Sequence, residues 1–332
     1  MATARDERPT SGIAVSRRAA FAALALANIL WAGAYAAGKI ALSEVSPVTL
    51  NAFRFTIAAL LLSPILIRER ARVWAILRSR NDLLTLGLLI LLGWVLNKTL
   101  EYIGLALSTA SDVALLISTE SLFTAALSWT VLRERVTRLG VAALALGMIG
   151  AYLVVARGLV PTFNPSGGVS DGARILGDLL VILSLFVEAY YTIRGKMVLT
   201  RWPPLFFTAL TITGSLVFWL PAGAGAIATG GWPQLTLASW LGIGYLAVFA
   251  TVGAYWLWFR GLTVFEGSAA APLLFIQPLL GTLIALRLLD ERLTWATVVG
   301  GALILLSMIL VLRGGAGATA PEVEAALVEP SP

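Results

Sequence analysis

Long apolar runs, broken only by short polar segments, dominate this sequence of 332 residues. A helix needs about 20 mostly apolar residues to cross a hydrocarbon core about 30 Å thick. Continuous runs of this length, with glycine and alanine interspersed, are typical of transmembrane helices and not of barrel strands. We therefore expect an all-α integral membrane protein. Ten spans are predicted, with approximate limits 19–40, 48–67, 83–105, 110–131, 138–156, 175–197, 204–222, 237–260, 268–288 and 294–313.

Two residue types with specialised chemistry are missing, because the chain has no cysteine and no histidine. Without cysteine there is no disulfide and no iron–sulfur site, and without histidine the commonest transition-metal ligand is absent. The ATP-binding pattern G-x-x-x-x-G-K-[ST] does not occur either, which excludes ATP-driven transport by this chain. A lipid-modifying enzyme would have to work with glutamate and lysine alone. We therefore expect no enzymatic activity, no cofactor and no metal.

The basic residues lie between the apolar runs and not on one continuous patch, which argues against a nucleic-acid partner. When the segments are assigned alternately to the two membrane faces, most lysines and arginines outside the spans fall on the face that holds the N-terminus. Basic loops stay on the cytoplasmic side of a membrane. Both termini are therefore expected in the cytoplasm, in a multi-pass protein of the bacterial inner (plasma) membrane.

The sequence repeats itself at an offset of 157 residues, with glycine, proline, lysine and glutamate matched in one register. Each half holds five predicted spans, an odd number, so the second half should enter the membrane upside down. Inverted repeats of this kind place a substrate site near the midplane, between the halves. The predicted fold is two inverted five-helix repeats around a central cavity. The matched positions include Pro47 with Pro204, Gly104 with Gly261, and Leu132–Thr137 with Leu289–Thr294.

The repeat also divides the chain into segments. The composition outside the repeats, polar at the start and rich in Gly, Pro and acid at the end, predicts disordered ends, and Pro and Gly predict a linker between the halves. The expected division is 1–17, a disordered cytoplasmic N-terminus; 18–158, the first five-helix repeat; 159–174, an external linker; 175–313, the second, inverted five-helix repeat; and 314–332, a disordered cytoplasmic tail.

Several residues near the ends of the predicted helices suit a stabilising role. Thr137 and Thr294 precede the last span of each half and are expected to be N-caps. Glu134 and Glu291 are expected to bond to nearby loop amides. Lys39, at the end of the first span, is expected to reach into the lipid headgroups.

Two stretches share a pattern in which a Glu, an apolar residue and a Thr precede a glycine-bearing final helix. They are RERVTRLGVAALALGMIGAYL from Arg133 and DERLTWATVVGGALILL from Asp290. A proline, Pro278, also lies in the middle of the preceding helix, in LLFIQPLLGTLIAL, although Ser121 stands at the equivalent position of the first half. In these features, residues 19–313 resemble the drug/metabolite transporter superfamily, specifically its ten-helix EamA-type members.

This resemblance implies a transporter. Members of the family export or exchange small metabolites, often amino acids, across the inner membrane through a cavity between the two halves. In overall layout the chain is most similar to aromatic amino-acid exporters of the YddG kind. The motifs are specific for the family and not for the substrate.

Glu120 lies at the centre of an apolar run, in LLISTESLFTAAL. A charged side chain at the bilayer centre costs roughly 2.5–3.5 kcal/mol on insertion scales, so it should face a cavity or a partner. The equivalent position of the second half, Gln277, is also polar, which favours a place beside the axis between the halves. We expect Glu120 to be a cavity residue; the alternative is that it only pairs with Arg54 or bonds between helices.

The third span contains a cluster of polar residues in GWVLNKTLEYIG. Asn97, Lys98, Glu101 and Tyr102 are linked by spacings of three or four residues, which brings them onto one helix face. They are candidate substrate-binding residues, and an internal Lys98–Glu101 pair is the alternative. In the second half the position of Glu101 becomes Trp258, so one half is expected to supply charge and the other aromatic surface.

Glu188 and Tyr191 lie in the sixth span, and Glu188 occupies the repeat position of Trp31. A belt at the membrane interface is the alternative for Tyr191, but a belt does not explain a glutamate near the middle of the span. Trp31 lies on a stripe with Asn28 and Tyr35, for which core packing is the main interpretation. The full set of candidate substrate-binding residues is Glu120, Lys98, Glu101, Asn97, Tyr102, Glu188, Tyr191, Trp258, Gln277, Trp31 and Arg54.

These residues suit a free amino acid, which carries a carboxylate and an ammonium group. Arg54 or Lys98 would receive the carboxylate. Glu120, Glu188 or Glu101 would receive the ammonium group, helped by cation–π contact with Trp or Tyr. The same inventory would also suit a lipophilic cation.

We therefore expect a secondary transporter that exports small metabolites, above all aromatic or hydrophobic amino acids, by alternating access and without ion coupling. The alternative is a proton-coupled exporter of lipophilic cations or drugs. The expected partners are an amino acid as small-molecule substrate and the lipid bilayer, with no nucleic acid. The protein is expected to be a monomer or a homodimer.

Overall fold

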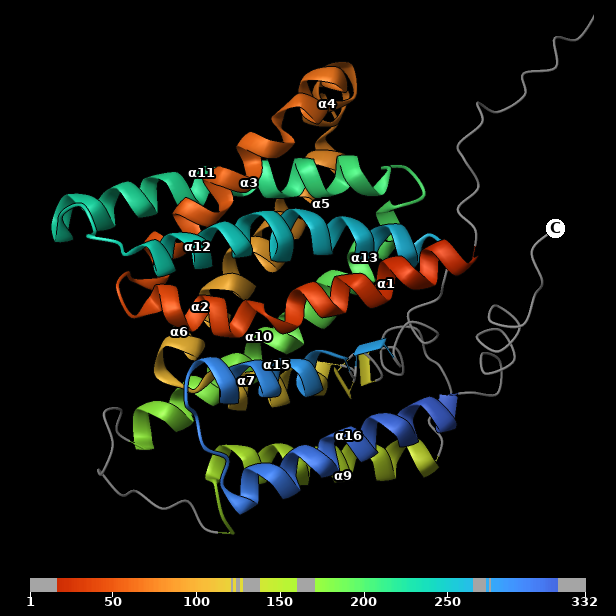
Figure 1. Ribbon diagram of the computed structural model, residues 1–332. Coiled ribbons are helices and arrows are strands. Elements are labelled where there is room, and N and C mark those ends of the chain that lie inside the picture. The colour runs from red at the N-terminus through yellow and green to blue at the C-terminus, as the bar shows by residue number, and fades with distance from the viewer. Residues whose placement is uncertain are drawn as a thin grey trace, which may run out of the picture.

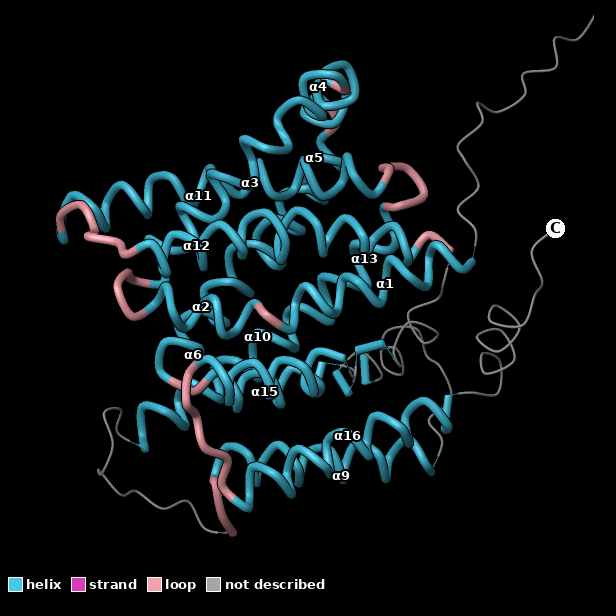
Figure 2. The backbone as a smooth tube through the Cα atoms, viewed as in Figure 1, coloured by secondary structure: helices cyan, strands magenta, loops and turns pink. Residues whose placement is uncertain are grey.

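The computed structural model describes residues 17–120, 122–123, 126–127, 138–159, 171–264, 273–274 and 276–315. Within these residues every regular element is a helix (Figure 1). Figure 2 shows that the described connections between helices are short. The prediction of an all-helical chain is therefore confirmed for the described residues.

Several helical segments follow one another directly, without a loop, and together form longer helices. Some of these longer helices contain a short 3₁₀ or π turn, labelled η. The elements are α1 (Arg17–Ala32), α2 (Ala34–Leu42), α3 (Pro47–Arg68), α4 (Arg70–Arg78), α5 (Arg80–Ile90), η1 (Leu91–Leu96), α6 (Asn97–Leu107), α7 (Ala110–Leu116), η2 (Ile117–Thr119), α9 (Arg138–Ala156), α10 (Asp171–Val198), α11 (Pro204–Gly230), α12 (Leu237–Tyr245), η3 (Leu246–Gly253), α13 (Ala254–Leu262), α15 (Ile276–Leu288) and α16 (Trp295–Gly315).

Among the described residues, six helices, counted together with the segments that continue them, are long and apolar enough to cross a membrane. They are Arg17–Leu42, Pro47–Arg68, Arg80–Leu107, Arg138–Ala156, Pro204–Gly230 and Leu237–Leu262. Three shorter apolar helices accompany them, and parts of the predicted spans 110–131 and 268–288 lie outside the described residues. These lengths and compositions are those of a multi-pass membrane protein.

Two elements differ from the predicted spans. α11 continues through Pro221 to Gly230, beyond the predicted limit at residue 222. Proline and glycine are weaker helix breakers in a membrane, where neighbouring helices satisfy the freed backbone groups. α4 was not predicted, because its nine residues include three arginines and it is too short to span a membrane.

Helices that are remote in sequence pack side by side. α3 packs against α11 and α9 against α16, and each of these two pairs joins repeat-equivalent parts of the two sequence halves; α7 packs against α15. α1 also packs against α13, and α6 against α10. Figure 1 shows α9 and α16 running together along one edge of the molecule. The two halves are therefore interlocked and share one interior.

Glycine permits two of these helix pairs to approach closely. A Cβ atom on Gly104 of α6 would lie 2.6 Å from the carbonyl oxygen of Gly177 on α10, and a Cβ atom on Gly177 would lie 2.7 Å from the carbonyl oxygen of Gly104. Gly150 and Gly300 form the same reciprocal contact between α9 and α16, at 2.6 Å each way. Inside a membrane no hydrophobic effect drives helices together, and small residues at such crossings stabilise the contact by allowing close van der Waals packing.

Side chains from distant loops cap several helix ends. Thr294 accepts a hydrogen bond from the backbone N–H of Thr297 at 3.1 Å, so it caps α16 as expected. Glu291 accepts from the backbone N–H groups of Ala110 and Ser111 at 2.8 Å each, and so caps α7. The corresponding residues of the first half, 134 and 137, lie outside the described residues.

The expectation that Lys39 reaches into the headgroups was wrong. Its ammonium group donates hydrogen bonds to the carbonyl oxygens of Leu105, at 2.9 Å, of Ala106, at 3.1 Å, and of Ser108. These carbonyls lie at the end of α6, where backbone acceptors lack partners and carry partial negative charge. Lys39 is therefore a C-terminal cap between α2 and α6.

We predict that the Gly104 crossing is sensitive to a single methyl group. Gly104→Ala should cost roughly 1–3 kcal/mol, because the neighbouring atom is backbone and cannot retreat without shifting α10. Gly87→Ala is the matched control: a Cβ atom there meets nothing within 4 Å, and alanine favours a helix over glycine by up to about 1 kcal/mol. Thermal unfolding of the purified protein in detergent should show a lower melting temperature for the first variant only. Equal melting temperatures for the two variants would contradict this prediction.

A second prediction concerns pH. The carboxylate of Glu44 accepts from the backbone N–H and the hydroxyl of Thr236, the N-cap of α12, at 2.8 Å each. The backbone N–H of Thr236, followed by the hydroxyls of Ser239 and Thr236, lowers the pKa of Glu44. Its stabilising effect is then complete above the usual glutamate pKa of about 4.3 and is lost as the pH falls through the lowered value. Wild type should melt above Glu44→Gln at pH 7, and the gap should narrow as the pH falls below about 4.3; a gap that does not change with pH would refute this role.

Candidate functional site

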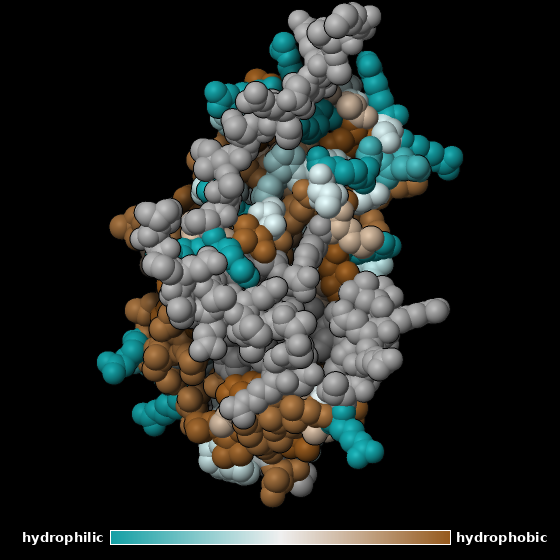
Figure 3. Space-filling model, turned by 90° about the vertical axis from the view of Figure 1, so that its right-hand side faces the viewer, coloured by the Kyte–Doolittle hydropathy of each residue, from teal (hydrophilic) through white to brown (hydrophobic). Residues whose placement is uncertain are grey.

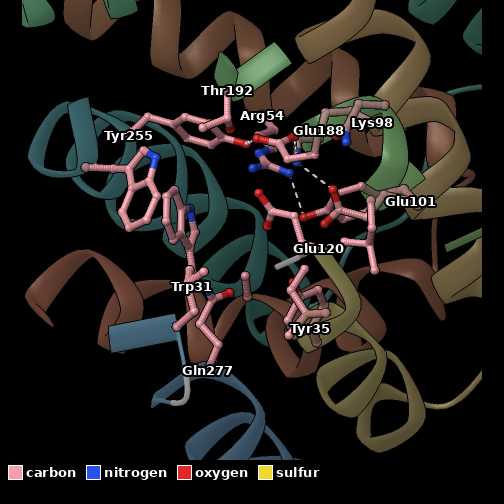
Figure 4. Close-up of a pocket in the computed structure, with 17 residues that line it drawn as sticks. Trp31, Tyr35, Arg54, Lys98, Glu101, Glu120, Glu188, Thr192, Tyr255 and Gln277 are labelled. Carbon is pink, nitrogen blue, oxygen red and sulfur yellow. Dashed lines mark hydrogen bonds and ion pairs between the residues drawn. The ribbon is translucent and has the colours of Figure 1, made fainter. Parts of the chain in front are cut away.

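One pocket between the helices collects almost all of the candidate residues (Figure 4). Its cavity has a volume of about 50 Å³, smaller than the cavity of about 150 Å³ that can hold benzene. Tyr191 is the candidate that does not line it. The lining residues are Trp31, Ala34, Tyr35, Arg54, Asn97, Lys98, Glu101, Tyr102, Ile117, Glu120, Leu185, Glu188, Thr192, Tyr255, Trp258, Leu274 and Gln277.

Positions related by the 157-residue offset line this pocket together. Both sequence halves therefore build one site, and they do so largely through equivalent positions. At most of these pairs, one half supplies a charged or polar group and the other an aromatic or different polar group. The pairs are Trp31 and Glu188, Tyr35 and Thr192, Lys98 and Tyr255, Glu101 and Trp258, Ile117 and Leu274, and Glu120 and Gln277.

A π-helical turn precedes the pocket in each half. η1 ends directly before Asn97, and η3 ends directly before α13, which carries Tyr255. In η3 the hydroxyl of Thr251 donates to the carbonyl oxygen of Leu246, five residues earlier, at 2.6 Å. π turns are rare and are frequent at functional sites. Here they lie at equivalent places beside the polar lining.

Lys98 is held between two carboxylates. Its Nζ atom lies 2.5 Å from Oε2 of Glu101 and 3.7 Å from Oε2 of Glu188. It also lies 5.7 Å from the ring centre of Tyr255, whose hydroxyl donates to Oε1 of Glu188 at 3.2 Å. The internal Lys98–Glu101 pair, which we considered as an alternative, is thus present, and α10 extends it into a three-residue cluster.

Arg54 is buried without a carboxylate partner. Its Nε atom donates to the hydroxyl of Thr251 and its Nη1 atom to the hydroxyl of Tyr102, both at 2.6 Å. In the part of the chain that the structure describes, neither Arg54 nor Glu120 makes an ion pair. The alternative in which Glu120 pairs with Arg54 is therefore not observed. One positive and one negative group face the same pocket with their charges unmatched (Figure 4).

Aromatic rings form another wall of the pocket. Trp31 makes edge-to-face contacts with Tyr255, at 5.1 Å between ring centres, and with Trp258, at 5.6 Å. Its indole N–H donates to the carbonyl oxygen of Ala250 at 2.9 Å, which joins α1 to η3. Figure 4 shows Trp31 on the side of the pocket opposite Lys98 and Glu101. The pocket therefore has a charged side and an aromatic side.

Two of the candidate amides hold helices together. Gln277 donates to the side-chain oxygen of Asn28 at 2.7 Å, and Asn28 donates to the carbonyl oxygen of Leu24 at 2.8 Å. Asn97 donates to the carbonyl oxygen of Ser184 at 2.9 Å. These bonds link α15 to α1 and α6 to α10, at the edge of the pocket.

The structure brings in lining residues that the sequence did not single out as candidates, and leaves one candidate out. Tyr191 is fully buried among Trp94, Phe207 and Phe259, away from the pocket. Tyr255, in contrast, is a lining residue. The sequence could have indicated Tyr255 as a lining residue, because it occupies the repeat position of the candidate Lys98.

A second buried ion cluster was also missed. Asp112 lies 2.5 Å from Arg157 and 3.7 Å from Arg174, and Arg174 lies 2.8 Å from Asp178. Asp178 also accepts from the hydroxyl of Ser108. The acidic and basic groups of this cluster pair with one another and join α7, the end of α9 and α10. We assign this cluster a structural role.

We predict that Lys98 stabilises the two carboxylates beside it. Lys98→Met should destabilise the protein by about 3–5 kcal/mol, because it leaves Glu101 and Glu188 buried without their ion-pair partner. The matched variant Lys98→Met/Glu101→Gln/Glu188→Gln removes the charges together and should recover most of the loss. Thermal unfolding in detergent measures both. The prediction fails if the triple variant is no more stable than the single one.

Comparisons with known proteins agree with a transporter. An uncharacterized transporter of Archaeoglobus fulgidus is 30% identical over 87% of this chain and 97% of its own length. The probable amino-acid metabolite efflux pump of Salmonella typhimurium is 27% identical, over 90% of this chain and 96% of its own. The S-adenosylmethionine/S-adenosylhomocysteine transporter of Chlamydia muridarum is 28% identical, over 79% and 81%. These names describe transporters and no enzyme.

A comparison with solved structures and a match to a family profile agree with the similarity to these relatives. A protein of known crystal structure superimposes with a TM-score of 0.61 at 19% identity, over 92% of this chain and 100% of its own, which shows a shared fold. The profile of the EamA-like transporter family matches twice, over residues 18–156 and again over residues 175–313. Because these matches cover most of the sequence, the chain belongs to the EamA-like transporter family.

Proposed function

We propose that this protein is a facilitative exporter of amino acids with aromatic or bulky hydrophobic side chains, acting across the bacterial inner membrane by alternating access. The observation that carries the proposal is the pair Arg54 and Glu120, which face one pocket with opposite charges and without an ion pair. A zwitterion supplies the missing partner of each group at once. No net charge needs to enter the site.

Arg54 is suited to the carboxylate of an amino acid. Thr251 and Tyr102 hold two of its nitrogen atoms, which fixes the plane of the guanidinium group and leaves further N–H donors for a ligand. Glu120 is suited to the ammonium group, because an ionised carboxylate has hydrogen-bond acceptors and no donor, whereas an ammonium group has only donors. Lys98 is a weaker candidate for the carboxylate, because it already lies 2.5 Å from Glu101.

The aromatic wall supports the choice of side chain. The rings of Tyr255 and Trp258 both contact Trp31, and Figure 4 shows Trp31 on the side away from Lys98 and Glu101. Apolar pockets with a few convergent polar groups are typical of small-molecule sites, and ring pairs add about 0.5–1.5 kcal/mol beyond their burial. An aromatic or large aliphatic side chain therefore fits this wall better than a charged one.

Alternating access follows from the size and symmetry of the site. The cavity of about 50 Å³ is too small for such a substrate, so the lining helices must move apart when it binds. Equivalent positions of the two halves line the pocket in pairs, which supports two inverted five-helix repeats and an axis through the site. With ten spans in all, both termini would lie on the same face, and the basic residues on that face favour the cytoplasm. Transport then follows the substrate gradient.

The names of two relatives fit the proposal. The Salmonella protein is named an amino-acid metabolite efflux pump, and the Chlamydia protein a transporter of S-adenosylmethionine and S-adenosylhomocysteine. All of these compounds carry an amino-acid end. By analogy, the charged side of the present pocket would bind that end, and the aromatic wall would set the selectivity for the side chain.

A second candidate function is proton-coupled export of lipophilic cations. Three carboxylates, Glu101, Glu120 and Glu188, face two cations, Arg54 and Lys98, so the fully ionised pocket carries one excess negative charge. A monovalent cation or a proton would neutralise that charge. Under this function, transport would depend on a pH gradient, whereas under the first it would not.

The test is exchange of radiolabelled phenylalanine, tryptophan, methionine and glutamate by purified protein in liposomes, with and without a pH gradient. We expect the first three to move and glutamate not to. Arg54→Gln and Glu120→Gln should each weaken transport roughly 10- to 100-fold, the value of one charged hydrogen bond of about 1.5–3 kcal/mol.

Arg201→Gln and Asp82→Asn serve as matched controls, because these two residues form an exposed ion pair that does not line the pocket. They should transport like wild type. Movement of a lipophilic cation such as tetraphenylphosphonium, driven by a pH gradient, with no amino-acid flux would replace the first function by the second. If neither kind of compound moves, both candidates are wrong.

A further inference from the structure

The connection between α3 and α5 is a short basic helix that the pocket does not use. Residues 68–80, here called the α4 segment, read RERARVWAILRSR. α4 itself covers Arg70–Arg78. It joins two candidate membrane spans, Pro47–Arg68 and Arg80–Leu107, so it is fixed at the surface of the membrane. In Figure 1 it stands at one end of the molecule, apart from the other helices.

α4 is attached by one face and exposed on the other. Ile76 is 3% exposed and packs in the hydrophobic core, with Val73 beside it. Trp74 is 60% exposed and Leu77 is 43% exposed. At 100° per residue, Trp74 lies almost opposite Ile76 on the helix. A large indole ring and a leucine therefore point away from the protein body.

Arginines flank the exposed ring. Arg70 and Arg78 lie four residues before and after Trp74, which places the three on one helix face. Within the described residues, neither arginine makes an ion pair, and the same holds for Arg68 and Arg80. Acid partners are instead engaged nearby by other arginines, since Glu69 binds Arg72 at 2.8 Å and Asp82 binds Arg201 at 2.7 Å.

The second half of the sequence has no basic segment at the equivalent position. The repeat-equivalent stretch, residues 225–237, reads GAIATGGWPQLTL and contains no charged residue. There α11 simply continues to Gly230. If the two halves are inverted, the two stretches lie on opposite membrane faces, and only one face receives a basic amphipathic helix. In Figure 3, hydrophilic side chains gather toward the upper end of the molecule, the end where α4 lies in Figure 1.

We propose that the α4 segment is an interfacial anchor that binds the headgroups of anionic phospholipids. Trp74 and Leu77 enter the boundary between headgroups and acyl chains, and Arg68, Arg70, Arg78 and Arg80 lie among the phosphates. Tryptophan favours that depth, and arginine side chains on the same face are long enough to keep their charged ends among the headgroups while the apolar groups lie deeper. A soluble partner fits less well, because both ends of α4 are tied to spans at the membrane surface.

Lipid binding is tested by native mass spectrometry of the full-length protein with phosphatidylglycerol or phosphatidylcholine. Wild type should bind phosphatidylglycerol in preference. Arg70→Gln/Arg78→Gln should weaken that binding roughly fivefold per arginine, about 30-fold in all. The control, Arg287→Gln/Arg292→Gln, removes the same charge from two exposed arginines at the other end of the helices and should change binding less than about twofold. Equal losses in the two variants would overturn the proposal.

The position of α4 is tested independently in otherwise unchanged protein. Because the chain has no cysteine, a nitroxide can be attached at Leu77→Cys alone, in vesicles that contain phosphatidylglycerol. Electron paramagnetic resonance should find the label below the headgroups, accessible to oxygen and shielded from a water-soluble nickel complex. A label exposed to water would overturn the proposal, and would point to a soluble partner on this face. Neither readout depends on transport activity, so the proposal stands or falls separately from the proposed function.

Discussion

The cost of a charge in the membrane interior governs the arrangement of this protein. Lys98 lies within a few ångströms of two carboxylates, Glu101 and Glu188, and two different helices, α6 and α10, supply this cluster. The same two helices meet at the reciprocal contact of Gly104 and Gly177, where any side chain would push them apart. A close glycine crossing thus brings a carboxylate to a lysine that could not remain charged alone. The remaining spans enclose this cluster and shield it from lipid.

Hydropathy predicted the six long apolar spans of the described residues, because lipid constrains every residue of a span in the same way. The sequence also indicated that Glu120, Gln277, Lys98 and Glu188 avoid lipid, and the structure places all four at one pocket. Whether they bind substrate is a matter for the transport experiment. What the pattern could not give is the direction of each side chain within the protein interior.

Tyr191 shows this limit, since it lies only three residues after Glu188 and yet packs into an aromatic core. Lys39 shows another, because the carbonyls that bind it belong to α6, far away in the sequence. The π turns η1 and η3 leave no recognisable mark in composition, and they shift the register of the helix directly before the polar lining. Contacts between distant helices decide all three features, and such contacts are invisible to periodicity.

At the pocket, the two halves are equivalent in position and different in chemistry, and this difference would orient a ligand under the proposed function. Glu188 faces the pocket from one half where Trp31 does so from the other, and Glu101 and Trp258 are related in the same way. Two identical halves would give a pocket with the same groups on both sides, in which an amino acid could lie either way round. Here the charges gather beside α6 and α10, and the rings beside α1 and α13. Under the proposed function, a zwitterion with an aromatic side chain would therefore have one favourable orientation in this pocket.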